Sequence, residues 1–313
     1  MSELFEDYLT TEEVEHIRTH KYVTTGYSWL DKKINPFWEI CANRLPYNLT
    51  PNKVTCLGGI ALYTGVIALA FYDITFTETL PTWVYWHFVL ALFLGQTLDA
   101  IDGKHARNTK RGSPLGQLMD HSCDAITNSC YCIFIAQSFR MGLSPTSLIA
   151  TQVFVHVTFF IATWQENATG ILSTHVNNLG VTEVQFLAMS LCLMGTSSKI
   201  VDFLTSSFIG TISYSDMAVY FCCIVLSITA SLYTIIKVLS NVKPSDYAKT
   251  LSPYLNLVLM VTCEVLISYF ENYRDYLLYY IVLNGLFFGI MISKLIMNTM
   301  SGRRFTIPCF EGV

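Results

Sequence analysis

The sequence has little charge and offers no frame for disulfides or zinc. Only 13% of its 313 residues are Asp, Glu, Lys or Arg, about half of the roughly 25% that is usual in soluble domains. Ten cysteines are present, but no CxxC pair occurs, and four of them lie inside apolar segments: Cys130, Cys132, Cys222 and Cys223. We interpret them as small buried apolar residues. The sequence is therefore not that of an ordinary soluble domain, a disulfide scaffold or a zinc module.

Other common signals are missing as well. The first fifty residues are mostly polar, so no secretory signal peptide is predicted. No internal repeat or low-complexity tract occurs. The net charge of −4 is too small to indicate a strongly charged partner, and no nucleic acid is expected to bind.

Long apolar segments dominate what is present. Hydrophobic residues make up 52% of the chain, and the mean hydropathy is +0.43. A membrane-spanning helix needs roughly 20 apolar residues. We therefore expect an all-α, polytopic transmembrane bundle of about eight spans. They are placed near residues 54–72, 81–98, 116–138, 146–165, 182–198, 214–236, 252–270 and 277–298.

Two surface helices are predicted in the first fifty residues, which we treat as a cytosolic or interfacial unit, residues 1–50. Thr10 and Glu13 have the spacing of a capping box, which predicts the start of the first helix. The second is expected over residues 36–45, where Phe37 and Trp38 are among the apolar residues that alternate with charges. This pattern is typical of an amphipathic helix that lies in the membrane interface.

The distribution of basic residues predicts the orientation. With the N-terminus in the cytosol, only Arg140, Lys199 and Arg274 fall on the far side, which leaves 16 of the 19 Lys and Arg on the cytosolic side. Such a positive-inside bias favours cytosolic termini. The acidic residues discussed next would also face the cytosol.

Four carboxylates gather between two apolar segments: Asp99, Asp102, Asp120 and Asp124. Each costs roughly 2.5 to 3.5 kcal/mol at membrane depth, so the group needs a compensating partner. On helices, Asp120 and Asp124 lie one turn apart on one face, and Asp99 and Asp102 lie about one turn apart. Carboxylate oxygens are the ligands that Mg²⁺ and Mn²⁺ prefer. The sequence predicts a pair of divalent cations, rather than ion pairs in an ordinary loop.

Small and basic residues accompany the acids. Gly103, Ala106 and Gly116 would let a bulky group approach the backbone closely. Four cations lie in the same stretch: Lys104, Arg107, Lys110 and Arg111. This mixture is suited to a phosphate ligand bridged by metal ions.

The motif Asp102-Gly103-x2-Ala106-Arg107-x8-Gly116-x3-Asp120-x3-Asp124 resembles the complete signature of the CDP-alcohol phosphotransferase family, with the usual extra acid at Asp99. Further segments resemble the eukaryotic choline and ethanolamine phosphotransferases of that family. They are residues 20–22, 51–55, 113–124, 163–170 and 181–185. The resemblance covers about residues 19–300.

The resemblance implies a division of the chain: a catalytic six-helix core, residues 51–237, then an additional transmembrane hairpin, residues 238–300, and a cytosolic tail, residues 301–313. Members of this branch typically have about ten spans, so their final hairpin is expected to be absent here. The resemblance also implies two Mg²⁺ or Mn²⁺ ions, a homodimer, and a location in the membrane of the endoplasmic reticulum or Golgi.

The implied activity is transfer of phosphoethanolamine or phosphocholine from CDP-ethanolamine or CDP-choline to diacylglycerol, with release of CMP. Asp99, Asp102, Asp120 and Asp124 would hold the metal ions, which stabilise charge in the transition state. The cations Lys104 and Arg107 would neutralise phosphate oxygens. Gly103, Ala106 and Gly116 would admit the nucleotide. Asn52 and Thr55 would either help to hold it or cap the first span.

The base that accepts the proton of the attacking hydroxyl is not fixed by the sequence. Asp124 and Glu183 are the main candidates, with His121 as a third. We slightly favour Glu183, because metal ions would occupy the lone pairs of Asp124. Many animal relatives have a histidine at the position of Thr163, so that base is excluded here. His156 lies two turns earlier on roughly the same face, but a lone histidine in a span is more often a packing residue.

Two other functions are compatible with parts of the pattern. One is the CDP-diacylglycerol branch of the same family, such as phosphatidylinositol synthase, whose chains are usually shorter. The other is a divalent-cation transporter, since acids inside a membrane also mark ion paths. Arg107 and the lysines argue against a cation path. The sequence does not decide between choline and ethanolamine.

Overall fold

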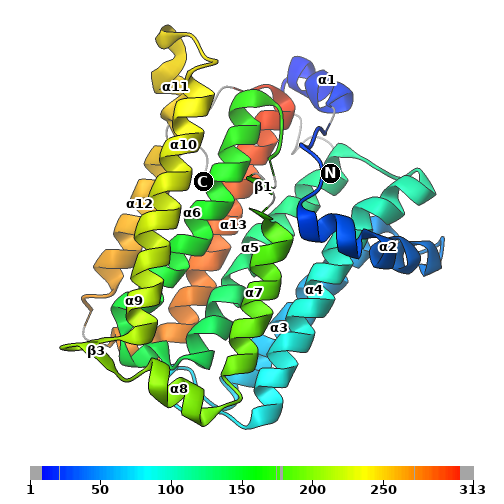
Figure 1. Ribbon diagram of the computed structural model, residues 1–313. Coiled ribbons are helices and arrows are strands. Elements are labelled where there is room, and N and C mark those ends of the chain that lie inside the picture. Colours follow the sequence, from blue (N-terminus) through cyan, green and yellow to red (C-terminus); the bar gives the residue numbers. More distant parts are fainter. Residues whose placement is uncertain (1–8, 21, 174, 177–178, 271, 304–313) are drawn as a thin grey trace.

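The computed structural model describes residues 9–20, 22–173, 175–176, 179–270 and 272–303. In these residues the chain is a bundle of long helices with two short hairpins (Figure 1). One end of the bundle, here called the site end, is where α3 begins and α4 finishes. The opposite end, called the far end, carries α8 and β3. The expectation of an all-α polytopic membrane protein is confirmed.

The first surface helix, α1 (Thr11–Thr19), has the predicted capping box. The Thr10 amide donates to Glu13 Oε2 at 2.7 Å, and the Glu13 amide donates to Thr10 Oγ1 at 3.3 Å. This helix packs against the end of α13, where Arg303 pairs with Glu13. The predicted helix start is therefore confirmed.

The second surface helix, α2 (Trp29–Arg44), begins well before the predicted residue 36. Ser28 and Asp31 form its capping box, with the Asp31 amide donating to Ser28 Oγ at 3.2 Å. The predicted first residue, Pro36, lies inside the helix instead. Trp38 is buried while Phe37 is exposed, so the helix has the predicted amphipathic character.

The core of the bundle contains α3 (Pro51–Ala70), α4 (Thr82–Thr109), α5 (Pro114–Ser138), α6 (Pro145–Thr169), α7 (Val181–Met194) and α13 (Leu277–Ser301). Although α13 comes last, it packs directly on α5 and α6. Gly285 and Gly289 allow this, since a Cβ at either position would overlap Ser129 or Ile126 of α5. Small residues four apart are a common means of close helix packing in membranes.

An outer layer completes the bundle: α9 (Tyr214–Phe221), a π-helical turn (Cys222–Ser227), α10 (Ile228–Leu239), α11 (Tyr247–Leu251) and α12 (Pro253–Ile267). At the far end lie α8 (Ser198–Leu204), the antiparallel hairpin of β3 (Ser207–Ile209) and β4 (Ile212–Ser213), and a 3-10 turn (Met141–Leu143). The remaining elements are the hairpin β1 (His175–Val176) and β2 (Leu179–Gly180) and the 3-10 turns Pro244–Asp246 and Tyr273–Tyr276.

Six helical segments among the described residues are long and apolar enough to cross a membrane: Pro51–Ala70, Thr82–Thr109, Pro145–Thr169, Tyr214–Leu239, Pro244–Ile267 and Tyr273–Ser301. The expected span 182–198 is wrong as one straight helix, because α7 stops at Met194 and α8 leaves it at 107°. Counted together, α7 and α8 give a seventh span. The break follows from Gly195, which is the C-cap of α7.

The expected span at 116–138 is a helix, α5, but it is not among the segments apolar enough to cross a membrane by composition. Its polar side chains include Asp120, His121 and Asp124. Because α3, α6, α7 and α13 all pack around it, these groups are shielded from the surroundings of the bundle. Of the predicted tail, residues 301–313, the part from 304 onward lies outside the described residues. The predicted division of the chain into a core, a hairpin and a tail stays a prediction.

Candidate active site

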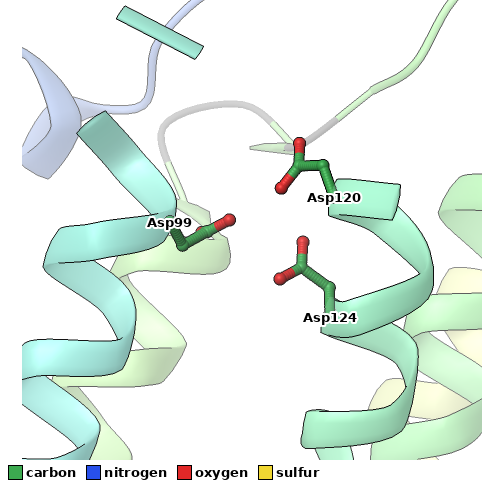
Figure 2. Close-up of side chains that lie close together, drawn as sticks. All are labelled: Asp99, Asp120 and Asp124. Carbon is green, nitrogen blue, oxygen red and sulfur yellow. The ribbon is translucent and has the colours of Figure 1, made fainter. Parts of the chain in front are cut away.

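Three of the four predicted carboxylates converge between two neighbouring helices. Asp99 extends from α4, and Asp120 and Asp124 extend from α5 toward it (Figure 2). One carboxylate oxygen from each residue lies within 4.8 Å of the others. Such a group of oxygens could hold a metal ion, and oxygen is the ligand type of Mg²⁺ and Mn²⁺.

The fourth acid, Asp102, lies one turn further along α4 and is only 4% exposed. Its Oδ2 accepts a hydrogen bond from the Thr55 hydroxyl of α3. Asp120 is within electrostatic range of Asp102 as well as of Asp99 and Asp124. Thr55 therefore fixes the orientation of the one carboxylate that stands beside the cluster of three.

The carboxylates fit a divalent cation on a structural ground as well. Asp120 Oδ1 is buried and accepts no hydrogen bond from any residue that the structure describes. Buried acceptors are nearly always paired, and four acids at short range repel one another. A cation bound at this point would satisfy the free oxygen and neutralise the repulsion.

A tight turn between α4 and α5 brings the two pairs of acids together. Lys110 ends α4 in the left-handed conformation, with φ of 56°. Ser113 then caps α5, and its Oγ accepts from the Gly116 amide at 3.0 Å. With so short a connection, the last turns of α4 and the first turns of α5 face each other.

Most residues predicted to hold the nucleotide lie at this end of α3, α4 and α5. A Cβ on Gly116 would stand 3.5 Å from Asn52 Oδ1, and one on Gly103 would stand 3.6 Å from an Arg107 guanidinium nitrogen. Ala106 is half-buried between Gly103 and the turn. The structure brings these positions together, while their contacts with a nucleotide stay predictions.

Lys104 is directed elsewhere. Its ammonium is 5% exposed and donates to Asn35 Oδ1 at 2.5 Å and to Glu39 Oε1 at 2.7 Å, both on α2. The hydrogen bond and the charge of Lys104 hold the pKa of the Glu39 carboxyl below its usual value. Lys104 thus fastens α2 to α4, and its predicted contact with phosphate stays untested.

Both carboxylate oxygens of Glu183 accept hydrogen bonds from backbone amides. It is the third residue of α7, and its Oε2 accepts from the Gly180 amide at 2.8 Å. Its Oε1 accepts from the Leu30 amide at 2.9 Å, which joins the start of α2 to the start of α7. The structure does not bring Glu183 into the carboxylate cluster.

His121 lies on the side of α5 that faces α6. Its Nε2 is 4.0 Å from Asp120 Oδ2, and its Nδ1 is 4.0 Å from Glu166 Oε2. Its ring stands edge-on to Tyr22, with 5.5 Å between the ring centroids. His121 therefore lies between the carboxylate cluster and two residues, Glu166 and Tyr22, to which the sequence analysis gave no role.

Those two residues, Glu166 and Tyr22, lie in segments that carry the family resemblance but were assigned no role. A signal for Glu166 was present, since it is a carboxylate near the end of an apolar span. Tyr22 could not have been placed from its own segment. Its neighbours in the fold, His121 and Glu166, are about 100 and 144 residues away in the chain.

His156 has the packing role that was expected of a lone histidine in a span. It is fully buried, stacks on Phe288 with ring centroids 4.3 Å apart, and points Nδ1 at Glu264 Oε1 at 3.3 Å. The Thr163 hydroxyl donates to the Phe159 carbonyl at 3.2 Å.

Comparison with known proteins decides the family. The sequence model of the CDP-alcohol phosphatidyltransferase family matches residues 48–211, more than half of the chain. This protein belongs to that family. The match contains the four acids, the turn between α4 and α5, and all of α6.

Individual relatives agree with this assignment. Cholinephosphotransferase 1 of Gallus gallus is 37% identical over 188 residues, which is 59% of this chain and 55% of the relative. Choline/ethanolaminephosphotransferase 1 of Saccharomyces cerevisiae is 30% identical over 213 residues, 68% and 54% of the two chains. An uncharacterised CDP-alcohol phosphatidyltransferase class-I protein of Dictyostelium discoideum is 36% identical over 165 residues, 52% and 41%. The chain thus spans about half the length of the curated relatives it matches.

Proposed function

We propose that this membrane protein transfers a phosphoalcohol from CDP-ethanolamine or CDP-choline to the free hydroxyl of diacylglycerol and releases CMP. The observation that carries the proposal is the convergence of Asp99, Asp120 and Asp124, with Asp102 beside them, at the end of a membrane bundle. The names of the relatives support the substrate class.

In this proposal the four acids bind metal ions and a basic residue binds phosphate. Asp99, Asp120 and Asp124 would hold two divalent ions together with Asp102, which Thr55 orients. Bound Mg²⁺ or Mn²⁺ would neutralise the pyrophosphate charge and orient the attacking and leaving oxygens. Arg107, exposed beside Gly103, would bind phosphate oxygens as they acquire charge.

We assign the proton of the attacking hydroxyl to Asp124. Both oxygens of Glu183 already accept backbone hydrogen bonds, so this residue is better suited to holding α2 against α7. Asp124 faces the space between α4 and α5 in which the reaction would take place (Figure 2). Glu183→Gln should then lower stability, whereas Asp124→Asn should lower the rate of transfer by about 10² to 10⁴.

The deciding assay uses purified full-length protein with diacylglycerol and Mg²⁺ or Mn²⁺, and compares CDP-choline with CDP-ethanolamine in parallel. We expect CMP and the matching phospholipid, with loss of activity on chelation and recovery on addition of metal. Turnover of CDP-diacylglycerol with inositol instead would indicate the other branch of the family. Metal flux into proteoliposomes without any transfer would indicate a transporter.

The proposal includes a cytosolic site, a homodimer and a membrane of the endoplasmic reticulum or Golgi. Orientation has a direct test in sealed vesicles. A membrane-impermeant thiol reagent on the lumenal side should label a cysteine placed at Leu143 of the far end, but not one placed at Asn108 near the site. The reverse labelling would overturn the cytosolic location of the site.

A further inference from the structure

Two residues beside the metal-ligand helices have no part in the proposed phosphate chemistry. Tyr22 belongs to the segment between α1 and α2, and 47% of its surface is exposed. Glu166 lies in the last turn of α6 and is 4% exposed. Between them stands the His121 ring of α5. Together they make a corner with one aromatic face, one acid and access from outside.

Tyr22 presents a neutral ring to this corner. It meets the His121 ring edge-on, at an interplanar angle of 67°. Crowding around its phenol raises the pKa of Tyr22, and the charges of Glu166, Asp120, Asp99 and Asp124 raise it further. The phenol therefore stays protonated. Of these acids, Glu166 is the one that holds no metal ion in the proposed function, and its carboxylate favours a cation near the ring.

Among the residues that the structure describes, Glu166 accepts a hydrogen bond through one of its two oxygens. Its Oε1 accepts from Gln117 Nε2 at 3.0 Å, and Gln117 in turn bonds His20 at 3.1 Å. Its Oε2 lies 4.0 Å from His121 Nδ1, which is beyond hydrogen-bond distance. A fixed carboxylate with a free oxygen is suited to binding a positive group.

The segment that carries Tyr22 is fastened to the bundle on both sides of the tyrosine. Beyond it, the Leu172 amide donates to the Val23 carbonyl at 2.9 Å, and the Thr25 amide donates to the Leu172 carbonyl at 3.1 Å. Before it, His20 bonds Gln117 of α5. These contacts hold the segment on both sides of Tyr22 without any ligand, which lowers the cost of ordering it when a ligand binds.

The position of the corner relative to the acids indicates which part of a donor would reach it. Two predicted nucleotide contacts, Asn52 of α3 and Gly116 at the start of α5, lie beside each other. Tyr22 and Glu166 instead lie beside His121, on the face of α5 toward α6. A donor whose pyrophosphate is held by the four acids would place its nucleoside on one side and its alcohol on the other.

We propose that Tyr22 and Glu166 form the subsite for the cationic head of the donor's amino alcohol, with the ring face and the free carboxylate oxygen sharing the positive charge. This inference rests on the proposed function and adds the residues that select a charged alcohol. Cation–π contacts of this kind are worth about 2- to 30-fold in binding. Loss of the Glu166 carboxylate should weaken binding of the charged donor more than loss of the Tyr22 ring.

The test compares a charged donor with a neutral one of similar size. The ratio of kcat/KM for CDP-choline or CDP-ethanolamine to that for CDP-propanol measures recognition of the cationic head, and CDP-propanol is the size-matched neutral donor for CDP-ethanolamine, because a methyl group replaces the ammonium. We expect Glu166→Gln to lower this ratio at least about tenfold and Tyr22→Leu to lower it several-fold, while Tyr22→Phe keeps it. Tyr27→Leu is the matched control, because Tyr27 lies in the same segment with similar exposure but faces Lys104.

The outcomes separate this subsite from the proposed function. Normal wild-type turnover with an unchanged ratio in Glu166→Gln would overturn the subsite alone. Wild-type protein that turns over no CDP-alcohol would overturn the proposed function and the subsite with it. If a variant is inactive with every donor, the ratio is taken from dissociation constants for CDP-choline and CDP-propanol, with binding of CMP and Mn²⁺ as the check that the fold is retained.

Discussion

Carboxylates at the two ends of the bundle differ in their partners, and the better buried of the two is not the metal ligand: Asp73 is 6% exposed, whereas the Asp120 side chain is 28% exposed. Asp73, in the far-end turn between α3 and α4, accepts from the amides of Thr75, Thr77 and Glu78 at 2.7, 2.8 and 2.9 Å. Asp120, at the site end, has a buried oxygen that accepts from none of the residues described. Enclosure alone thus does not indicate function in this protein. Between these two residues, the number of hydrogen bonds separates the acid that holds a turn from the acid with an oxygen free for a cation.

Two further acids belong with Asp73. Glu183 caps α7 and holds Leu30 of α2, and Asp216 caps α9 through the Ser213 amide at 3.0 Å and also accepts from the Ser147 hydroxyl. Each satisfies backbone donors that a helix start leaves free. Sequence spacing cannot separate these acids from a metal ligand, since both kinds occur near helix starts.

The largest expected effect of a substitution is the loss of activity when an acid at the site end is replaced. Asp120→Asn should reduce transfer by more than about 10²-fold, because the amide removes a negative ligand while its size and helix are unchanged. Thermal unfolding in detergent should be unaffected or slightly improved, since a repelling charge is gone. Activity and unfolding temperature are measured on one preparation, and near-normal turnover at saturating Mg²⁺ or Mn²⁺ would refute the metal assignment.

Asp73→Asn should give the opposite result. The variant loses charge-assisted acceptors for three amides, so unfolding should become easier by about 1 to 3 kcal/mol. Turnover per folded molecule should remain close to that of the wild type, because this turn lies at the other end of the bundle. A loss of activity larger than the loss of folded protein would show that the two ends are coupled.

The pH dependence of stability should also show that Asp73 is an acid that stabilises the fold. Burial on its own would raise the pKa of Asp73, but its hydrogen bonds from the Glu78, Thr75 and Thr77 amides hold it below the usual value of 3.8. A depressed native pKa stabilises the fold above the unfolded pKa, and this contribution disappears as the pH falls through the native pKa. The difference in unfolding temperature between wild type and Asp73→Asn should therefore be constant above about pH 5 and shrink below pH 4. A difference that grows toward acid pH would mean that the sign is wrong.

The smallest effect is expected at the junction of α2 and α4. Glu39→Gln keeps a hydrogen-bond acceptor for Lys104 but removes the charge, and Asn35 still accepts from the same ammonium. Because Glu39 is largely exposed, stability should change by less than about 1 kcal/mol. Turnover at low and high salt shows whether Lys104, once released, assists phosphate binding. A marked gain in donor affinity would restore its predicted role.

The parts of the site that were predictable are those that a single helix determines. Asp120 and Asp124 are four residues apart, so their common face followed from helix geometry alone. The start of α2 was missed because the amphipathic pattern is clear only from about residue 36, whereas the helix begins at a capping box made by two short polar side chains, Ser28 and Asp31. Rules that involve only neighbouring residues predict where a helix can be capped and which residues share a face. Where a segment offers two possible first residues for a helix, these rules do not choose between them.

What could not be predicted depends on contacts between distant segments. Glu183 matched a family acid, but its occupation by the Leu30 amide exists only once α2 lies against α7. Lys104 carries the positive charge that would bind a phosphate, but in the folded chain its ammonium donates to Glu39 and Asn35 instead. The corner of Tyr22, His121 and Glu166 unites three elements that no spacing rule relates.

The bend after α7 also has a consequence for the surrounding lipid. With 14 residues, α7 is about 21 Å long at 1.5 Å per residue, whereas the hydrocarbon core of a bilayer is about 30 Å thick. Its continuation, α8, turns away by 107° and cannot supply the missing length. As a straight helix, α7 alone is about one third shorter than an ordinary bilayer is thick. Hydrophobic mismatch should therefore thin the membrane locally and favour the protein's accumulation in thinner bilayers.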